Sequence, residues 1–223
     1  IRDRDEEGKL MTGADAGAVV ALLEGLRVDA LGINCGLGPE KMLAWVKKLC
    51  ELSSLPVCVT PNAGLPKVKE GRTVYDVTPQ AFAGQMKLIA QAGARMLGGC
   101  CGTTPEHIKA MKEALGGLEP LPVIPKNTTM ISSYSHSVSF DGPPVLIGER
   151  LNPTGKQKLK SALREGNISY ILEEALRQQE AGAMALDVNV GLPEIDEAKM
   201  LSELIPRIQA VSDLPLQIDT SDY

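Results

Sequence analysis

The feature that most constrains the fold is a regular alternation of short apolar runs with longer amphipathic stretches. The first three apolar runs have the length of buried parallel strands, and they lie at 30–35, 55–60 and 94–98. Apolar side chains recur at helical spacing in four further stretches, at 15–26, 39–51, 79–92 and 105–115. A strand followed by a helix, repeated along the chain, predicts an α/β fold with parallel sheets.

Proline and threonine mark where three of these helices begin. Pro39, Pro79 and Pro105 stand at the first helical turn, where a missing N–H costs no hydrogen bond. Thr78 and Thr104 directly precede two of these prolines and are suitable N-cap residues. The predicted helix starts therefore rest on local chemistry as well as on periodicity.

The alternation lapses in the middle of the chain and then resumes. Residues 116–144 contain five prolines and a Ser/Thr-rich run without helical periodicity, which predicts an interdomain linker. After it we expect strands at 145–149, 185–189 and 216–219 and helices at 157–181 and 194–211. Three strands on each side of a linker cannot close an eight-stranded barrel, so we expect two partial (β/α)8 TIM barrels.

Composition and charge exclude several classes of function. The 23 Lys and Arg against 28 Asp and Glu give a net charge of −5, and only 3% of residues are aromatic, so we expect neither a nucleic-acid partner nor an anionic membrane partner. Apolar runs such as 19–23 end long before the 18 residues that a membrane span requires. Five cysteines without a signal peptide predict reduced thiols and a cytoplasmic protein. Because the chain starts at Ile1 and stops after an apolar run, we expect neither end to be native.

Chemically useful side chains recur where the predicted strands end. Active sites of βα barrels are assembled at this edge, so the recurrence predicts functional sites, although each residue alone could be a solvated loop residue. The residues concerned are Cys35, Cys100, Cys101, Glu149, Asn189 and Asp219.

Three of these residues are thiols. Adjacent residues of an extended strand point to opposite faces, so Cys100 and Cys101 can face one metal only if the flanking glycines permit a turn. With Cys35 they would supply three thiolates and leave one position open, which is the pattern of a catalytic zinc site. The alternative is that the vicinal pair consists of ordinary buried cysteines.

The other thiols and the histidines have simpler interpretations. Cys50 lies on a predicted helix and Cys58 in the middle of a strand, so both are interpreted as small core residues. Neither His107 nor His136 has a partner at metal-binding spacing. We interpret both as solvated, and His107 is a weak candidate for a residue that lines a site.

Several motifs resemble known families. GINCGLGPEKM at 32–42, VTPNAGLP at 59–66 and GGCCGTTPEHI at 98–108 resemble the second half of the homocysteine S-methyltransferase barrel. The later motifs IGERLNPTG, ALDVNVGLPEIDE and QIDTSD resemble the opening of the pterin-binding barrel of methyltetrahydrofolate-dependent methyltransferases. In tandem they resemble the cobalamin-dependent methionine synthases. The resemblance implies a C-terminal half of a homocysteine-binding zinc barrel over 1–116, a linker over 117–143, and an N-terminal part of a pterin-binding barrel over 144–223.

The resemblance also implies roles for individual residues. Cys35, Cys100 and Cys101 match zinc ligands that bind the homocysteine sulfur, and no catalytic residue is implied beyond them. Asp219 matches an acid that hydrogen-bonds the pterin ring. Residues that match the lining of the folate pocket are Glu149, Asn152, Asp187 and Asn189. Asp187 could instead be a strand residue whose side chain is satisfied by the backbone of a neighbouring loop.

The implied reaction is methyl transfer from 5-methyltetrahydrofolate, through cobalamin, to zinc-bound homocysteine. The cobalamin signature Asp-x-His-x-x-Gly does not occur here, so cobalamin is expected on a module of the same or a separate chain. The glycine-rich first strand of the homocysteine barrel is also absent, so we expect these residues alone to be inactive and prone to aggregate. Two alternatives stay open: a zinc-dependent homocysteine methyltransferase fused to another folate enzyme, and a non-catalytic zinc-stabilised α/β module.

Overall fold

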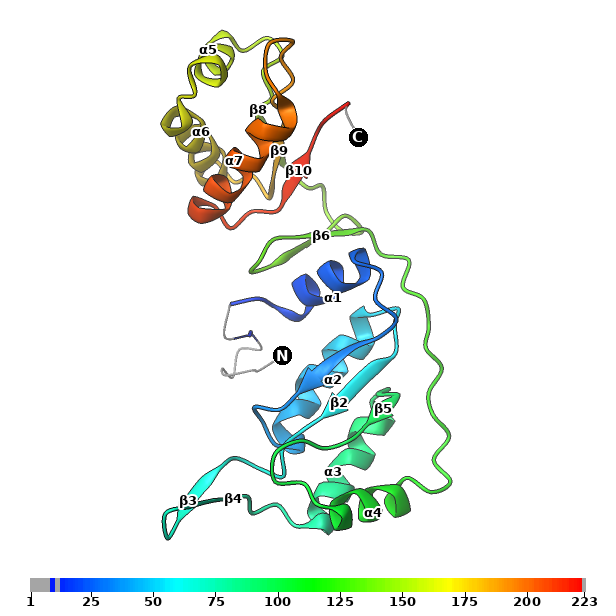
Figure 1. The fold of residues 1–223 in the computed structure, drawn as a ribbon. Helices are drawn as coiled ribbons and strands as arrows, with labels where there is room; N and C mark the ends of the chain where they lie inside the picture. Colours follow the sequence, from blue (N-terminus) through cyan, green and yellow to red (C-terminus); the bar gives the residue numbers. More distant parts are fainter. Residues whose placement is uncertain (1–8, 11–12, 222–223) are drawn as a thin grey trace. The chain divides into compact units, whose positions relative to one another are not determined.

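The structure is a computed structural model that describes residues 9–10 and 13–221 (Figure 1). The chain divides into two compact units, Ile1–Asn127 and Thr128–Tyr223. Each unit contains a three-stranded parallel sheet with helices packed on it, so the prediction of an α/β fold with parallel sheets is confirmed.

The sheet of the first unit has the strand order β1-β2-β5. These strands are β1 (Leu31–Asn34), β2 (Val57–Thr60) and β5 (Met96–Leu97), and the register places Ile33 opposite Val59. All pairs are parallel, so the carboxyl ends of the strands lie at one edge of the sheet. That edge carries the cysteines discussed below.

The first unit has four helices among its described residues, and all were predicted to within one residue at each end. They are α1 (Ala16–Gly25), α2 (Pro39–Leu52), α3 (Pro79–Gln91) and α4 (Pro105–Ala114). Thr78 caps α3 by accepting a 3.3 Å hydrogen bond from the N–H of Ala81. Trp45, Phe82 and Met86 of these helices belong to the same hydrophobic core as Val59 of β2, and each of these side chains is almost fully buried. Burial of a large apolar side chain contributes roughly 1.5–3 kcal/mol, so this core stabilises the whole sheet edge.

A short hairpin of the first unit was not predicted. Strands β3 (Lys67–Lys69) and β4 (Arg72–Val74) pair antiparallel and project away from the body of the unit (Figure 1). Glu70 and Gly71 form the two-residue turn with φ of 51° and 73°, as a tight hairpin turn requires. Four of the eight residues at 67–74 are charged and only Val74 is partly buried, so no buried apolar run marks these strands.

The second unit has a parallel sheet in the order β10-β9-β8. Its strands are β8 (Ile147–Leu151), β9 (Ala185–Val188) and β10 (Leu216–Ile218). A register shift between Gly148 and Leu151 interrupts the pairing of β8 with β9. The N–H of Arg150 donates instead to Oε1 of Gln178, at 2.6 Å. Glu149 therefore lies within an irregular strand and not at its end, which corrects the sequence interpretation.

The helices of the second unit also differ from the prediction. The single helix expected at 157–181 is two helices, α5 (Gln157–Glu165) and α6 (Ile168–Glu180). Gly166 ends α5 in the left-handed conformation, and Asn167 caps α6 by accepting from the N–H of Tyr170. The third helix, α7 (Glu197–Val211), begins three residues later than expected, where Asp196 caps it.

The stretch expected to be a linker is not wholly irregular. Residues Met130–Ser132 and Ser137–Ser139 form a second hairpin, β6–β7, within the second unit. Val138 of this hairpin is buried, and His136 lies 3.8 Å from Asp213 of the same unit. In the part of the chain that the structure describes, neither parallel sheet closes into a barrel, and no helix is long and apolar enough to cross a membrane.

Candidate functional site

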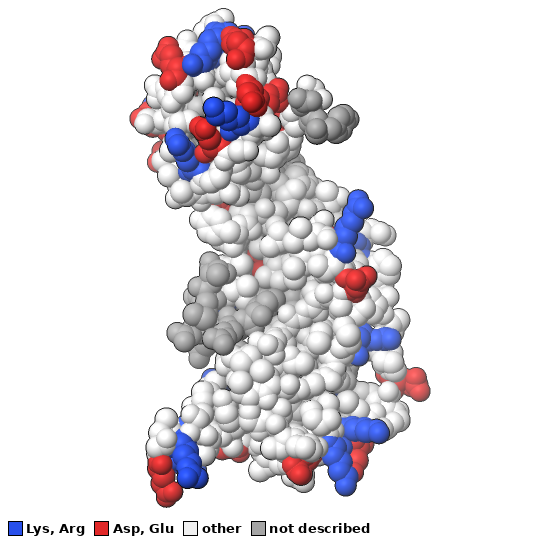
Figure 2. All heavy atoms as spheres, in the orientation of Figure 1, with Lys and Arg blue, Asp and Glu red and all other residues white. Residues whose placement is uncertain are grey.

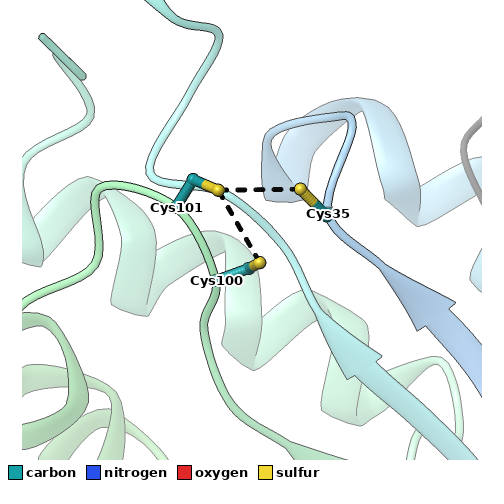
Figure 3. Close-up of side chains that lie close together, drawn as sticks. All are labelled: Cys35, Cys100 and Cys101. Carbon is teal, nitrogen blue, oxygen red and sulfur yellow. Dashed lines mark hydrogen bonds between the residues drawn. The ribbon is translucent and has the colours of Figure 1, made fainter. Parts of the chain in front are cut away.

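Three thiols meet at the carboxyl edge of the first sheet (Figure 3). Cys35 follows β1, while Cys100 and Cys101 lie in the loop after β5. The sulfur of Cys101 is 3.7 Å from that of Cys35 and 3.9 Å from that of Cys100. The three sulfurs all lie within 4.8 Å of one another, and all five cysteines of the chain are free thiols.

Backbone turns next to each cysteine bring the sulfurs together. Cys35 itself has a φ of 63°, and Gly36 follows with 79°, so the chain turns sharply at the end of β1. In the other loop, the N–H and the hydroxyl of Thr103 donate to the carbonyl of Cys100, at 3.1 and 2.6 Å. A side chain at Gly99 would lie 2.5 Å from the Thr103 methyl, so this turn requires a glycine. The predicted non-extended turn at the vicinal cysteines is confirmed.

Asn62 ties the two cysteine loops together, and sequence reasoning missed it. Its side chain is 4% exposed, and its Oδ1 accepts a 3.1 Å hydrogen bond from the N–H of Cys101. The neighbouring N–H of Ala63 donates to the carbonyl of Cys101 at 2.9 Å. Asn62 comes two residues after β2, so the same strand-end argument that selected Cys35 could have found it.

The surroundings shift the pKa values of two of the thiols in opposite directions. A hydrogen bond from the backbone N–H of Gly36 lowers the pKa of Cys35, assisted by hydrogen bonds from Cys100, Cys101 and Asn62. Burial raises the pKa of Cys100, and its hydrogen bond with Cys35 acts in the same direction. Of these two thiols, Cys35 is therefore the one whose surroundings favour the thiolate, which is the form that binds metal.

Tyr75 is a further side chain at this site that the sequence did not indicate. It lies between β4 and α3, in a loop with no strand-end position to mark it. A side chain at Gly102 would lie 2.2 Å from Cγ of Tyr75, so the tyrosine ring rests directly on the residue after Cys101. Desolvation and a hydrogen bond with Cys101 both raise the pKa of Tyr75, which keeps its phenol protonated.

The sulfur spacing fits a zinc ion. Zinc–sulfur bonds of about 2.3 Å in a tetrahedral site place the sulfurs about 3.8 Å apart. The two measured separations, 3.7 and 3.9 Å, bracket this value, whereas a disulfide requires about 2.05 Å. Cys101 is exposed and the other two thiols are partly exposed, so solvent reaches the cluster. The cluster is therefore consistent with a zinc site that has three thiolate ligands and one open position.

His107 is not solvated, so that interpretation was wrong. Its side chain is buried, and its ring packs edge-on against Phe82. Its Nδ1 accepts from the N–H of Thr104 at 3.2 Å, which places the proton on Nε2, and Nε2 donates to the carbonyl of Val77 at 2.9 Å. His107 therefore fastens the start of α4 to the loop that carries Tyr75.

Cys50 and Cys58 lie outside the metal-ligand cluster. Both are partly buried, and burial raises the pKa of Cys50. Cys50 packs against the first-unit core, as the sequence predicted for a small core residue.

In the second unit, the Asp219 carboxylate is the acceptor for two amide side chains. Its Oδ2 accepts from Nδ2 of Asn189 at 3.0 Å and from Nδ2 of Asn152 at 3.3 Å. Asn152 follows β8, Asn189 follows β9 and Asp219 follows β10. The three adjacent strands thus bring together three of the five residues that were expected to line a folate pocket.

The other two expected residues have different surroundings. Asp187 lies on β9 and is 7% exposed, and desolvation raises its pKa, although a hydrogen bond from Asn152 acts in the opposite direction. The carboxylate of Glu149 is largely exposed and accepts a 2.7 Å hydrogen bond from Nζ of Lys156, whose side chain is mostly buried. Lys156 was not predicted, because it lies within a stretch of several lysines with no distinguishing mark.

An open pocket of about 680 Å³ adjoins this cluster. Its wall includes Asn189 and Asp219 together with Thr154 and the first turn of α7. Glu197 of that turn accepts a 2.7 Å hydrogen bond from the hydroxyl of Thr220, which follows β10. The pocket presents carboxylates and an amide to a ligand, groups that suit a heterocycle with several N–H donors.

Charged side chains are mixed over the face of the molecule that Figure 2 shows. Lys and Arg lie among Asp and Glu on this face of each unit and do not gather into one basic patch. This agrees with the acidic net charge of −5.

Comparisons with known proteins give the following similarities. The profile of the family described as homocysteine S-methyltransferase matches residues 1–115. Methionine synthase of Mycobacterium leprae is 31% identical over 223 residues, and that of Mycobacterium tuberculosis is 31% identical over 218. Each alignment covers 96% of this chain, and the chain spans 18% of the length of each relative.

A solved structure is also similar in sequence. The homocysteine methyltransferase MmuM of Escherichia coli, in an oxidized form, is 35% identical over 50% of this chain and 34% of its own, with a TM-score of 0.39.

Proposed function

This chain belongs to the homocysteine S-methyltransferase family, and we propose that its first unit holds zinc on Cys35, Cys100 and Cys101 for the methylation of homocysteine. The observation that carries the proposal is the convergence of three sulfurs within 4.8 Å at the sheet edge. A tetrahedral zinc site with three protein ligands leaves one position for a substrate atom. Zinc, when bound, would supply Lewis acidity that lowers the pKa of the homocysteine thiol.

The chain's own residues keep this site in order. The turns at Cys35 and Gly102 orient the sulfurs. Asn62 ties both loops together, because its N–H donates to the carbonyl of Leu37 and its Oδ1 accepts from the N–H of Cys101. The backbone N–H of Gly36 favours the thiolate form of Cys35 and so supports metal binding at neutral pH. These groups position the ligands before the metal arrives, which reduces the entropy lost on binding.

For the second unit we propose that Asp219, Asn152 and Asn189 bind the pterin of 5-methyltetrahydrofolate, with Asp187 and Glu149 nearby. The support is the hydrogen-bonded cluster at the ends of three adjacent strands and the pocket of about 680 Å³ beside it. Similarity to two methionine synthases over 96% of the chain supports the assignment of both units to one such enzyme. We therefore interpret the two sheets as parts of two (β/α)8 barrels.

In the complete reaction that we propose, homocysteine gains the methyl group and becomes methionine, and 5-methyltetrahydrofolate becomes tetrahydrofolate. Cobalamin would carry the methyl group between the two sites, and the proposal assigns its binding to a further module of the same or a separate chain. The two units of this chain would each bind one substrate, so damage to one site should spare binding at the other.

Metal analysis of variants tests the proposal. The reduced chain should retain about one zinc ion, and Cys100→Ala should lose it because two thiolates remain. Cys50→Ala is the matched control, because Cys50 is a partly buried thiol outside the cluster, and this variant should retain zinc. Full zinc retention by Cys100→Ala, measured by atomic absorption, would contradict the assignment.

A further inference from the structure

Tyr75 lies against the loop that carries two of the three thiols. A side chain at Gly102 would be 2.2 Å from Cγ and 2.4 Å from Cβ of Tyr75, so the ring fills the space above this glycine. Gly102 directly follows Cys101 and has a φ of 78°. The ring therefore covers the turn that directs the Cys101 sulfur toward the other two.

Contacts of the two residues that follow Tyr75 hold its loop in place. Asp76 forms an ion pair with Lys67 of the β3–β4 hairpin. The N–H of Val77 donates to the carbonyl of Ala63 at 3.1 Å, and the carbonyl of Val77 accepts from Nε2 of His107 at 2.9 Å. Ala63 in turn donates its N–H to the carbonyl of Cys101. A continuous set of hydrogen bonds thus connects the Tyr75 loop to the Cys101 loop.

The position of the ring on Gly102 brings the phenol of Tyr75 close to the neighbouring thiols. In agreement with this, desolvation, a hydrogen bond with Cys101 and the charges of Cys101, Cys35 and Cys100 raise the pKa of Tyr75. A phenol is an O–H donor and a thiolate is an acceptor, so the donor in this pair is the tyrosine. Groups that donate hydrogen bonds to metal ligands set the orientation of those ligands and the charge that they give to the metal.

We propose that Tyr75 is a positioning residue of the three-cysteine site, which holds the Cys101 turn by packing on Gly102 and donates its O–H to the Cys101 sulfur. The proposal rests on the proposed function, because it assumes that the three thiolates bind a metal. It makes two separable claims, one for the ring and one for the hydroxyl.

Cobalt(II) added to the full, reduced chain tests both claims, because thiolate ligands give cobalt a charge-transfer band in the near ultraviolet. Tyr75→Phe keeps the ring and removes the O–H donor. Without that hydrogen bond the Cys101 thiolate gives up electron density more readily, so the band should move to lower energy. Tyr75→Ala also removes the ring and should weaken cobalt affinity about 10-fold. Tyr134→Phe, at an exposed tyrosine of the second unit, should change neither quantity.

Each outcome decides one claim. A band of Tyr75→Phe at the wild-type energy overturns the hydrogen bond, and wild-type affinity in Tyr75→Ala overturns the packing role. If Tyr75→Ala does not fold by circular dichroism, Tyr75→Leu takes its place, since it keeps apolar bulk without a ring over Gly102. A wild-type chain without any thiolate–cobalt band would contradict the metal site itself, and the Tyr75 proposal with it. A normal wild-type band that no variant alters overturns only the role of Tyr75.

Discussion

The carboxylate of Asp219 accepts two amide hydrogen bonds on a single oxygen, Oδ2, so its other oxygen is available to a ligand. A carboxylate can accept from the N–H donors of a pterin edge, and a hydrogen bond to a charged group contributes about 1.5–3 kcal/mol. In the proposed site, Asp219 therefore acts through its charge and its acceptor geometry together.

We expect Asp219→Asn to weaken the binding of 5-methyltetrahydrofolate roughly 10- to 100-fold, because one charge-assisted hydrogen bond is lost. Zinc retention by the first unit should not change. Calorimetric titration and metal analysis of the same sample measure both quantities. Asp141→Asn is the control, because Asp141 is exposed. Unchanged folate affinity, or a parallel loss of zinc, would contradict the division into two sites.

Asp187 leads to a prediction on pH. Desolvation raises its pKa above the ordinary 3.8, and Asp219 and Glu149 reinforce the shift against the opposing effects of Asn152 and Lys156. The folded state thus favours the protonated form, so the stability contributed by this group is complete below pH 3.8 and is lost as pH rises through the raised pKa. A buried carboxylate that costs stability at neutral pH is typical of a residue kept for function.

Asp187→Asn should therefore raise the free energy of unfolding at pH 7, because the amide has no charge to desolvate. The difference from the wild type should shrink as pH falls toward 3.8. Urea denaturation of both proteins at several pH values provides the measurement. A variant that is less stable than the wild type at pH 7 would show that the Asp187 carboxylate is satisfied by its neighbours.

At the level of elements, the sequence predicted those parts whose chemistry is local. The prolines and caps at 78–79 and 104–105 marked helix starts, and short apolar runs marked the six parallel strands. The two hairpins were missed because Lys67–Val74 is charged and because Ser137–Ser139 lies in a Ser-rich run. The break at Gly166 was missed because apolar spacing continues across it.

The same reasoning explains which site residues could be predicted. Parallel strands end at one edge, so strand-end residues such as Cys35 and Asp219 could be placed at such edges without a structure. Tyr75 and Lys156 reach their sites from loops whose course depends on tertiary contacts. No local pattern in the sequence encodes such a position.

Substitution of two glycines by alanine should change the free energy of unfolding in opposite directions. Gly166 has a φ of 65°, and no atom lies within 4 Å of the position that a β-carbon would take there. Gly166→Ala should therefore destabilise the second unit by about 1 kcal/mol through backbone strain alone. Gly84 lies inside α3 with equal space and an ordinary φ, so Gly84→Ala should stabilise the first unit by about 0.5–1 kcal/mol. Thermal unfolding measures both changes. Equal effects of the two substitutions would contradict the left-handed conformation at Gly166.

At the scale of the whole molecule, each parallel sheet ends in edge strands that pair with only one neighbouring strand among the described residues. Two of these edge strands are β5 and β10. Their residues Met96 and Ile218 are 42% and 46% exposed. An apolar edge strand can pair with a second chain. The chain on its own should therefore self-associate as its concentration rises.

Ile218→Lys should reduce this association, because a charge on an edge strand opposes pairing. Ile108→Lys is the control, since Ile108 is similarly exposed, to 40%, but lies on helix α4. Sedimentation velocity over a range of concentrations distinguishes the variants. A wild-type chain that stays monomeric throughout, or an equal effect of both substitutions, would contradict association through sheet edges.

The central claim is that three cysteine sulfurs hold one metal and leave a position for the substrate sulfur. X-ray absorption at the zinc edge of the zinc-loaded chain measures this directly. We expect three sulfurs at about 2.3 Å and one lighter ligand without homocysteine, and four sulfurs with homocysteine in excess. Fewer than three sulfurs in the first sample, or a zinc shell that saturating homocysteine leaves unchanged, would contradict the account.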